Sequence, residues 1–184
     1  MRKTKRKTRK LFKKSKKFEH GMITEFDETY NGVPFFRKVF WYPKKPKIKD
    51  EIDISQLAYN EQAIIKILMK NPHPNIVSFY HINKRYLDME LLDTENIDIE
   101  KAKIQMKKVK TFLHGLGIIY MDWKPDNIGK DKYGNYKLFD FDASGLVNTK
   151  GWKIKPVELF AFRAAKHKKY PIQMDDWTFN EYIR

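Results

Sequence analysis

Hydrophobic residues follow two different periods along this chain, and the change of period predicts where strands give way to helices. Residues 18–42 are rich in β-branched and aromatic residues and are interrupted by the hairpin signal Asn31-Gly32, so they predict a strand-rich sheet. Residues 55–69 instead have the period of an amphipathic helix, with Ser55 as its N-cap. The apolar side chains that set this period are Leu57, Ala58, Ile65 and Leu68.

The pattern next predicts two more strands and a second helix. Residues 78–82 and 86–90 have strand character and are joined by a short polar turn. Residues 98–117 have apolar side chains at every third or fourth position and end in a Gly-containing turn. We expect this helix to be core scaffolding. Residues 157–168 also have helical character.

One charged residue, Glu61, lies on the apolar stripe of the first helix, midway between Leu57 and Ile65. A carboxylate that faces a core is costly unless a cation pairs with it. Lys38 is the natural partner, because apolar residues flank it in the preceding strand region. The alternative is that Lys38 is an ordinary exposed strand lysine.

A second group of polar residues lies at fixed spacing within residues 120–142. Asp122 is followed five residues later by Asn127, and Asp140 comes thirteen residues after that. Residues 131–135 predict a hairpin turn, because Gly and Asn tolerate positive φ. This hairpin would bring Asn127 and Asp140 together, and their oxygen atoms suit a Mg²⁺ ion that also binds phosphate. Asp122 would then be free to accept a proton; the alternative is a solvated turn without chemistry.

Composition is that of a folded domain in a reducing compartment. The chain has 184 residues, 41% of them hydrophobic and 15% aromatic, enough for a real core. It contains no cysteine, so disulfides and thiolate metal sites are excluded. The sequence has no membrane-spanning apolar run and no signal-peptide pattern. We therefore expect a soluble, intracellular protein of the cytoplasm or nucleus.

The net charge of +15 is concentrated at one end. Residues 1–17 contain eleven Lys or Arg and no acid, and such a block of like charge cannot bury enough surface to order itself. We expect a disordered or extended tail before a domain at 18–184. Two functions of the tail stay open: attraction to nucleic acid or another polyanion, and a solubilising or nuclear-targeting role.

Residues 120–142 resemble the catalytic core of protein kinases. The family pattern H-R-D-L-K-P-x-N is matched at four positions, which are Asp122, Lys124, Pro125 and Asn127. Asp140-Phe141-Asp142 stands where the family has D-F-G, and residues 73–77 match the family's H-P-N-I-V. The resemblance extends from residue 18 to about 180 and is strongest over 55–142.

The resemblance implies an α+β, bilobal fold with ATP bound between the lobes. The N-lobe, at about 18–92, would be a small antiparallel sheet with one helix; the C-lobe, at about 93–184, would be helical and truncated. ATP and Mg²⁺ would be used to phosphorylate Ser or Thr of a protein substrate, because Lys124 is the residue that serine/threonine enzymes carry.

The resemblance also implies a role for each site residue. Asp122 would accept the proton of the substrate hydroxyl, and Lys124 would steady the transferring group. Mg²⁺ would be held by Asn127 and Asp140. Lys38 and Gly21 would lie near the phosphates of ATP, and Glu61 would hold Lys38 in place. Glu90 and Leu92 would belong to a hinge segment that contacts the adenine.

Several departures from the family pattern keep other functions open. The G-x-G-x-x-G pattern is absent, Met121 replaces the Arg of H-R-D, and Asp142 replaces the Gly of D-F-G. These changes favour a pseudokinase that binds without turnover, and the basic tail favours a structural protein associated with nucleic acid. Near the end, residues 175–180 resemble the D-x-W-S-x-G pattern that opens a later helix. Such a short kinase domain is the kind of economy expected of a viral genome, which would place the protein in a host cell or, alternatively, in the virion.

Overall fold

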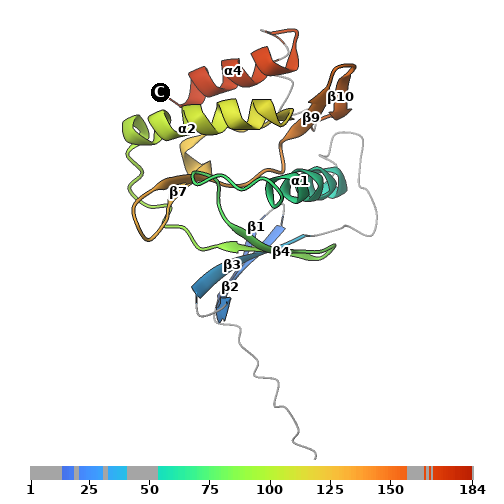
Figure 1. The fold of residues 1–184 in the computed structure, drawn as a ribbon. Helices are drawn as coiled ribbons and strands as arrows, with labels where there is room; N and C mark the ends of the chain where they lie inside the picture. The colour runs from blue at the N-terminus through green and yellow to red at the C-terminus, as the bar shows by residue number, and fades with distance from the viewer. Residues whose placement is uncertain are drawn as a thin grey trace, which may run out of the picture.

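A computed structural model describes residues 14–18, 21–30, 33–40, 54–156, 164, 166 and 168–183. Figure 1 shows an antiparallel sheet at one end of the molecule and helices α2 (Ile99–Gly115) and α4 (Pro171–Tyr182) at the other. Helix α1 (Ile54–Leu68) lies between them. The described part of the chain is therefore α+β, as the sequence predicts.

The larger sheet has five strands in the order β1-β2-β3-β5-β4, all paired antiparallel. Its strands are β1 (Lys14–Phe18), β2 (Gly21–Tyr30), β3 (Val33–Val39), β4 (Phe79–Ile82) and β5 (Tyr86–Glu90). The predicted strands at 78–82 and 86–90 are confirmed. Lys38 lies on the central strand, opposite Ile23 on one side and Leu87 on the other.

Helix α1 packs its apolar stripe against this sheet. Ala58 and Ile65 are buried in one cluster with Val77 and Leu87 from the neighbouring strand segments. The helix begins at Ile54, so Ser55 lies inside the first turn and the prediction that Ser55 is the N-cap is wrong. Serine is tolerated in a first turn, and packing of the apolar face contributes more than cap chemistry to where a helix starts.

Helix α2 forms as predicted and enters the main core. The Asp98 side chain caps it by accepting a hydrogen bond from the Lys101 backbone N–H. At its other end Gly117 has a φ of +73°, and a Cβ there would lie 2.7 Å from the Val147 carbonyl oxygen. Only glycine fits this turn. The buried residues of the helix are Ala102, Met106, Val109 and Leu113.

Two smaller sheets complete the region after α2. A hairpin joins β7 (Ile128–Lys130) to β8 (Tyr136–Leu138), preceded by the short 3-10 helix η1 (Pro125–Asn127). A three-stranded sheet has the order β10-β9-β6 and consists of β6 (Ile118–Ile119), β9 (Gly145–Asn148) and β10 (Gly151–Ile154).

Helix α4 starts four residues earlier than the sequence pattern at 175–180 predicts. Pro171 occupies its first turn, where the missing N–H costs no hydrogen bond, so the prediction that a helix opens at Asp175 is wrong. Its residue Phe179 packs edge-to-face on Trp123, with ring centroids 4.9 Å apart. Most of the predicted helical segment 157–168 lies outside the described residues.

The boundary predicted between tail and domain falls inside a strand. Residues 1–13 lie outside the described residues, but Lys14 to Lys17 belong to β1 and pair with β2. The prediction of a tail up to residue 17 used only the Lys and Arg content of the segment. It did not take into account backbone hydrogen bonds between β1 and β2.

Among the described helices, none has the length and apolar character needed to cross a membrane.

Candidate active site

The hairpin β7–β8 brings Asn127 and Asp140 to the same place, as their spacing predicts. Ile128 pairs with Leu138, and the Phe139 N–H donates to the Asn127 carbonyl oxygen at 3.0 Å. The turn is closed by the Asp131 N–H, which donates to the Asn135 carbonyl oxygen at 3.0 Å. Asp140 therefore follows directly on the residue that is bonded to Asn127.

Lys38 joins three segments that are far apart in the sequence. Its Nζ lies 2.9 Å from Glu61 Oε2 on α1 and 2.7 Å from Asp140 Oδ1. The predicted contact between Lys38 and Glu61 is thus present. Asp142 Oδ2 lies 3.7 Å from the same ammonium. The sequence treats Asp142 only as a departure from D-F-G, and its contact with Lys38 follows from the fold.

Burial and charge act in opposite directions within this cluster. Burial raises the pKa of Glu61 to about 7, because the cost of removing its carboxylate from water exceeds the attraction of Lys38. Burial likewise raises the pKa of Asp142 to about 6. For Lys38, burial favours the neutral amine, but Asp140 and Glu61 outweigh it and hold the lysine pKa well above its usual value.

A second, local cluster surrounds Asp122. Its Oδ2 accepts hydrogen bonds from Lys124 Nζ at 2.7 Å and from Asn127 Nδ2 at 2.8 Å. Among the hydrogen bonds of the described residues, none uses the other oxygen, Oδ1. Burial lowers the pKa of Lys124, but the hydrogen bond and charge of Asp122 outweigh it and raise the pKa overall.

The two clusters belong to one site. The charges of Asp122 and Lys124 both contribute to the pKa of Asp142, and the charge of Asp140 contributes to that of Lys124. Asn127 links the clusters, because its Nδ2 donates to Asp122 Oδ2 and its carbonyl oxygen accepts from the Phe139 N–H, next to Asp140. The structure therefore brings together the predicted residues Lys38, Glu61, Asp122, Lys124, Asn127 and Asp140.

The backbone is strained at two positions of this site. Met121 and Asp140 have φ values of +69° and +61°, in the left-handed region that residues with a Cβ rarely adopt. Such a conformation costs about 1–3 kcal/mol and persists only where the surroundings fix it. Lys38 holds the Asp140 side chain, and the Met121 N–H donates to Asp175 Oδ1 at 2.7 Å.

Asp175 is a positioning residue whose contacts the sequence does not reveal. It is fully buried and accepts hydrogen bonds at Oδ1 from the Met121 N–H and from Trp123 Nε1, the latter at 2.8 Å. Its Oδ2 lies 2.7 Å from His114 Nε2. The signal that could have found it is the one that found Glu61: an acid on the buried face of a helix, next to Met174.

The predicted hinge residues Glu90 and Leu92 connect the large sheet to the hairpin. The Glu90 N–H donates to the Ser78 carbonyl oxygen at 2.8 Å, and its carboxylate accepts from Lys137 Nζ at 2.7 Å. A contact from Glu90 to adenine would therefore have to use its carbonyl oxygen. Leu92 packs so close to Gly129 that a Cβ there would lie 2.7 Å from Leu92 Cβ. Gly129 is thus required on β7, a role the sequence analysis missed.

Gly21 lies at the start of β2, beside the strand that carries Lys38. It pairs with Phe18 across the β1–β2 connection, and Ile23, two residues further on, pairs with Lys38. Gly21 therefore lies on the strand next to Lys38, and its predicted place near the phosphates stays a prediction.

The donor set around Asp140 fits a hard divalent cation. Three carboxylates surround one ammonium, which leaves two negative charges uncompensated when all are ionised. Because Asn127 Nδ2 donates to Asp122, its amide oxygen is the atom that could reach a cation. One carboxylate and one amide oxygen are few ligands, as is usual for Mg²⁺ that keeps water and phosphate oxygens. In the described part of the chain, no group of three or more His, Cys, Asp or Glu is arranged to hold a metal.

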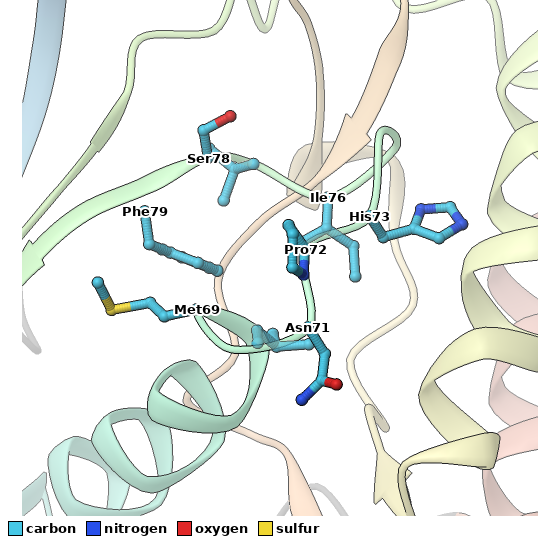
Figure 2. A pocket seen from close by; sticks show the side chains of 9 residues that line it. Met69, Asn71, Pro72, His73, Ile76, Ser78 and Phe79 are labelled. Carbon is cyan, nitrogen blue, oxygen red and sulfur yellow. The ribbon is translucent and has the colours of Figure 1, made fainter.

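A separate small cavity lies in the loop between α1 and β4, away from this chemistry. Figure 2 shows Met69, Ile76 and Phe79 lining it. His73 stacks on Phe112 with ring centroids 4.7 Å apart, and its Nδ1 accepts from the Asn75 N–H at 3.1 Å. These contacts engage the His73 ring with its neighbours in the loop and with helix α2.

Comparison with known proteins points to one class. No protein-family model matches the chain. It is 34% identical over 109 residues to sperm motility kinase 3A of Mus musculus. The aligned region is 50% of this chain and 20% of that protein. It is 26% identical over 116 residues to the putative CBL-interacting protein kinase 27 of Oryza sativa subsp. japonica, covering 54% and 29%.

A third similarity is to the probable serine/threonine-protein kinase KCC4 of Saccharomyces cerevisiae, at 28% identity over 111 residues and 51% of this chain. The chain spans only 11% to 29% of the length of these three relatives. The matches support a relationship to the protein kinase superfamily. One of the three is named a probable serine/threonine-protein kinase.

Proposed function

We propose that this chain is a serine/threonine protein kinase that transfers the γ-phosphoryl group of ATP to a protein hydroxyl. The contact of 2.7 Å between Lys38 and Asp140 carries the proposal. Lys38 is the residue proposed to bind phosphate, and Asp140 is the residue proposed to bind Mg²⁺. The contact joins these two residues although 102 positions separate them in the sequence. We further propose that the two ends of the molecule act as two lobes, with the nucleotide between them.

Asp122 has the geometry of the residue that receives the proton. Lys124 and Asn127 both bind its Oδ2, which orients the carboxylate and leaves Oδ1 to accept from the substrate hydroxyl. As the hydroxyl oxygen bonds to the γ-phosphorus, the bond from that phosphorus to the bridging oxygen breaks and ADP leaves. The proton of the hydroxyl passes to Asp122. Lys124 then lies beside the transferring group, where its charge stabilises the oxygens.

Lys38 and Glu61 have binding and positioning roles. The Lys38 ammonium would bind phosphate oxygens of ATP, and Glu61 holds that ammonium in place from helix α1. Asn127 and Asp140 would hold Mg²⁺, which when bound neutralises charge on the phosphates. Gly21 and the carbonyl oxygen of Glu90 would border the nucleotide, with Leu92 against the adenine.

A pseudokinase is the second candidate, because Asp142 adds a carboxylate beside Lys38. Two measurements on the wild-type chain separate the candidates. A kinase is stabilised against heat by Mg²⁺-ATP and moves label from [γ-³²P]ATP to Ser or Thr. A pseudokinase shows the thermal shift without transfer. Absence of both would refute both proposals and leave a structural role.

We also propose that the N-terminal basic residues attract nucleic acid or another polyanion. Residues 1–13 contain eight Lys or Arg and no acid, and they precede strand β1. Because residues 14–17 belong to the sheet, the test is removal of 1–13 alone. The slope of log affinity for DNA against log salt concentration should become shallower by several units, with little change in melting temperature. An unchanged slope would exclude this role for residues 1–13.

A further inference from the structure

The positive charge outside the N-terminal tail is concentrated in one segment. Residues 143–174 contain seven Lys or Arg and one acid, whereas residues 18–142 contain nineteen of each sign. The domain is thus neutral up to Asp142 and strongly basic immediately after it. An uneven distribution of charge does not stabilise a fold. It indicates instead which charged partners a surface attracts.

The structure places this segment beside Asp122. Strand β9 pairs with β6, so that Gly145 lies opposite Ile119, three residues before Asp122. Ala164 packs in one hydrophobic cluster with Met121, the residue before Asp122. Half-buried Trp152 of β10 joins the same cluster, and Figure 1 shows the β9–β10 hairpin next to the start of α4.

The lysines of this segment point to solvent. All six that the structure describes are exposed: Lys150, Lys153, Lys155, Lys166, Lys168 and Lys169. Within the described residues, no carboxylate lies within ion-pair distance of Lys150, Lys153, Lys168 or Lys169. Closer to the catalytic residues the pattern is the opposite, since Lys38, Lys124 and Lys137 each contact an acid.

We infer that Lys150, Lys153, Lys168 and Lys169, here called the basic rim, bind acidic residues that flank the Ser or Thr to be phosphorylated. The inference rests on the proposed phosphoryl transfer and narrows its substrate to an acidic peptide segment. A peptide whose hydroxyl lies at Asp122 would extend past the basic rim, where its carboxylates would meet exposed ammonium groups that no described carboxylate holds. The same rim would repel a peptide with basic flanks, so it selects among substrates as well as attracting them.

The test uses two full-length variants of equal net charge. Lys150→Ser/Lys153→Ser/Lys168→Ser/Lys169→Ser removes four charges from the basic rim. The control, Lys66→Ser/Lys70→Ser/Lys107→Ser/Lys108→Ser, removes four exposed charges from α1, the turn after it, and α2. Three fluorescent peptides carry the same acceptor Ser. The residues on either side of that Ser are Glu in the first peptide, Gln in the second and Lys in the third. Their affinity is measured by anisotropy without nucleotide at physiological salt.

We expect the wild type to prefer the Glu peptide over the Gln peptide by about tenfold, a gain that several exposed ion pairs can supply. The basic-rim variant should lose most of this preference, and the control should keep it. Equal loss in both variants, or no preference in the wild type, would overturn the inference. Loss of affinity for a short single-stranded oligonucleotide, with peptide binding intact, would also overturn it and assign the rim to nucleic acid.

The outcome is separable from that of the proposed function. Peptide affinity is measured without ATP, so a chain that fails to transfer phosphate can still show the preference. In that case the basic rim stands as an acidic-peptide surface and the kinase proposal fails. Transfer to all three peptides with equal KM would instead leave the kinase proposal intact and remove the basic rim from substrate choice.

Discussion

The Lys38 cluster and the Asp122 cluster differ in how the chain assembles them. The Lys38 cluster joins strand β3, helix α1 and the residues after β8, so each contact depends on the packing of the whole molecule. The Asp122 cluster lies within six residues, and its hydrogen bonds need only one loop and η1. One is a product of tertiary structure and the other of local structure.

The two clusters also differ in charge balance. Around Lys38 three carboxylates face one ammonium, whereas Asp122 faces one ammonium and one amide. An excess of negative charge is costly without a cation and is suited to binding one. A balanced and oriented carboxylate is suited to accept a proton. The difference leads us to assign binding to the first cluster and transfer to the second.

The largest effect should come from Lys38→Met, which removes the ammonium that Glu61, Asp140 and Asp142 share. We expect the free energy of unfolding to fall by about 2 kcal/mol, since unpaired buried carboxylates remain. Affinity for Mg²⁺-ATP should fall by more than about tenfold. Urea unfolding and calorimetric titration measure the two quantities. Lys66→Met, an exposed site on the same helix as Glu61, is the control and should change neither.

Asp140→Asn should separate metal binding from nucleotide binding. It keeps the shape of the side chain but removes the charge beside Lys38 and the charge proposed to bind Mg²⁺. We expect the gain in ATP affinity on adding Mg²⁺ to shrink by about tenfold, while ATP affinity in EDTA stays the same or rises. Calorimetric titrations with and without Mg²⁺ decide this. An unchanged Mg²⁺ effect would remove Asp140 from the metal site.

A smaller effect should appear in the pH dependence of stability. The pKa of Glu61 rises from 4.5 to about 7 on folding, so the folded state holds a proton that the unfolded state releases in this range. The free energy of unfolding should therefore fall as pH rises from about 4.5 to about 7, by up to about 1.4 kcal/mol per pH unit. Asp142, with its pKa raised to about 6, adds an effect of the same sign.

Glu61→Gln tests this because it keeps the size of the side chain and cannot titrate. Urea unfolding across that pH range should give a flatter profile for the variant than for wild type. Glu100→Gln, at an exposed position in α2, should leave the profile unchanged. A wild-type slope in the Glu61→Gln variant would show that Glu61 is ionised throughout.

The smallest effect should come from Thr149→Ala in the β9–β10 turn. Met121 replaces the family's Arg and is buried with Ile119, Ala164 and Met174, so it offers no charge to a phosphate on this turn. We expect activity to stay within about twofold of wild type, since the chain would need no phosphorylation there. Steady-state kinetics measures this, with Thr149→Val as a control of similar shape. A loss above about tenfold would indicate that another residue, such as Lys150, pairs with a phosphate.

Ser144, the other Ser or Thr of residues 143–157, is not a target for phosphorylation in this fold. It is fully buried, and its Oγ lies 3.4 Å from the Tyr120 carbonyl oxygen. The sequence cannot distinguish it from Thr149, because both lie in a segment rich in small and polar residues. Their different exposure follows from the pairing of β9 with β6.

The parts of the site that could be predicted from the sequence are those governed by short spacing or by burial of a charge. The hairpin that joins Asn127 to Asp140 follows from the turn residues at 131–135. The contact of Lys38 with Glu61 follows from an acid on an apolar stripe. Both are local rules applied to side chains whose periodicity is clear.

Other contacts depend on how elements pack and leave no local signal. Asp142 approaches Lys38 because β3 and the residues after β8 meet in space. The basic residues of β1 pair with β2 although their charge predicts a disordered tail. Gly129 must be glycine only because Leu92 packs against it. The early start of α4 is different, since Pro171 is a recognisable N1 residue and could have been used.

The division of roles between the two clusters can be tested directly by single-turnover transfer at saturating Mg²⁺-ATP. Asp122→Asn is compared with Asp126→Asn, an exposed neighbour on η1 that contributes to neither cluster. We predict that Asp122→Asn lowers the rate of transfer by about 10²–10⁴-fold while its ATP affinity stays within about twofold of wild type. Asp126→Asn should match wild type in both. A wild-type rate of transfer in Asp122→Asn would contradict the account.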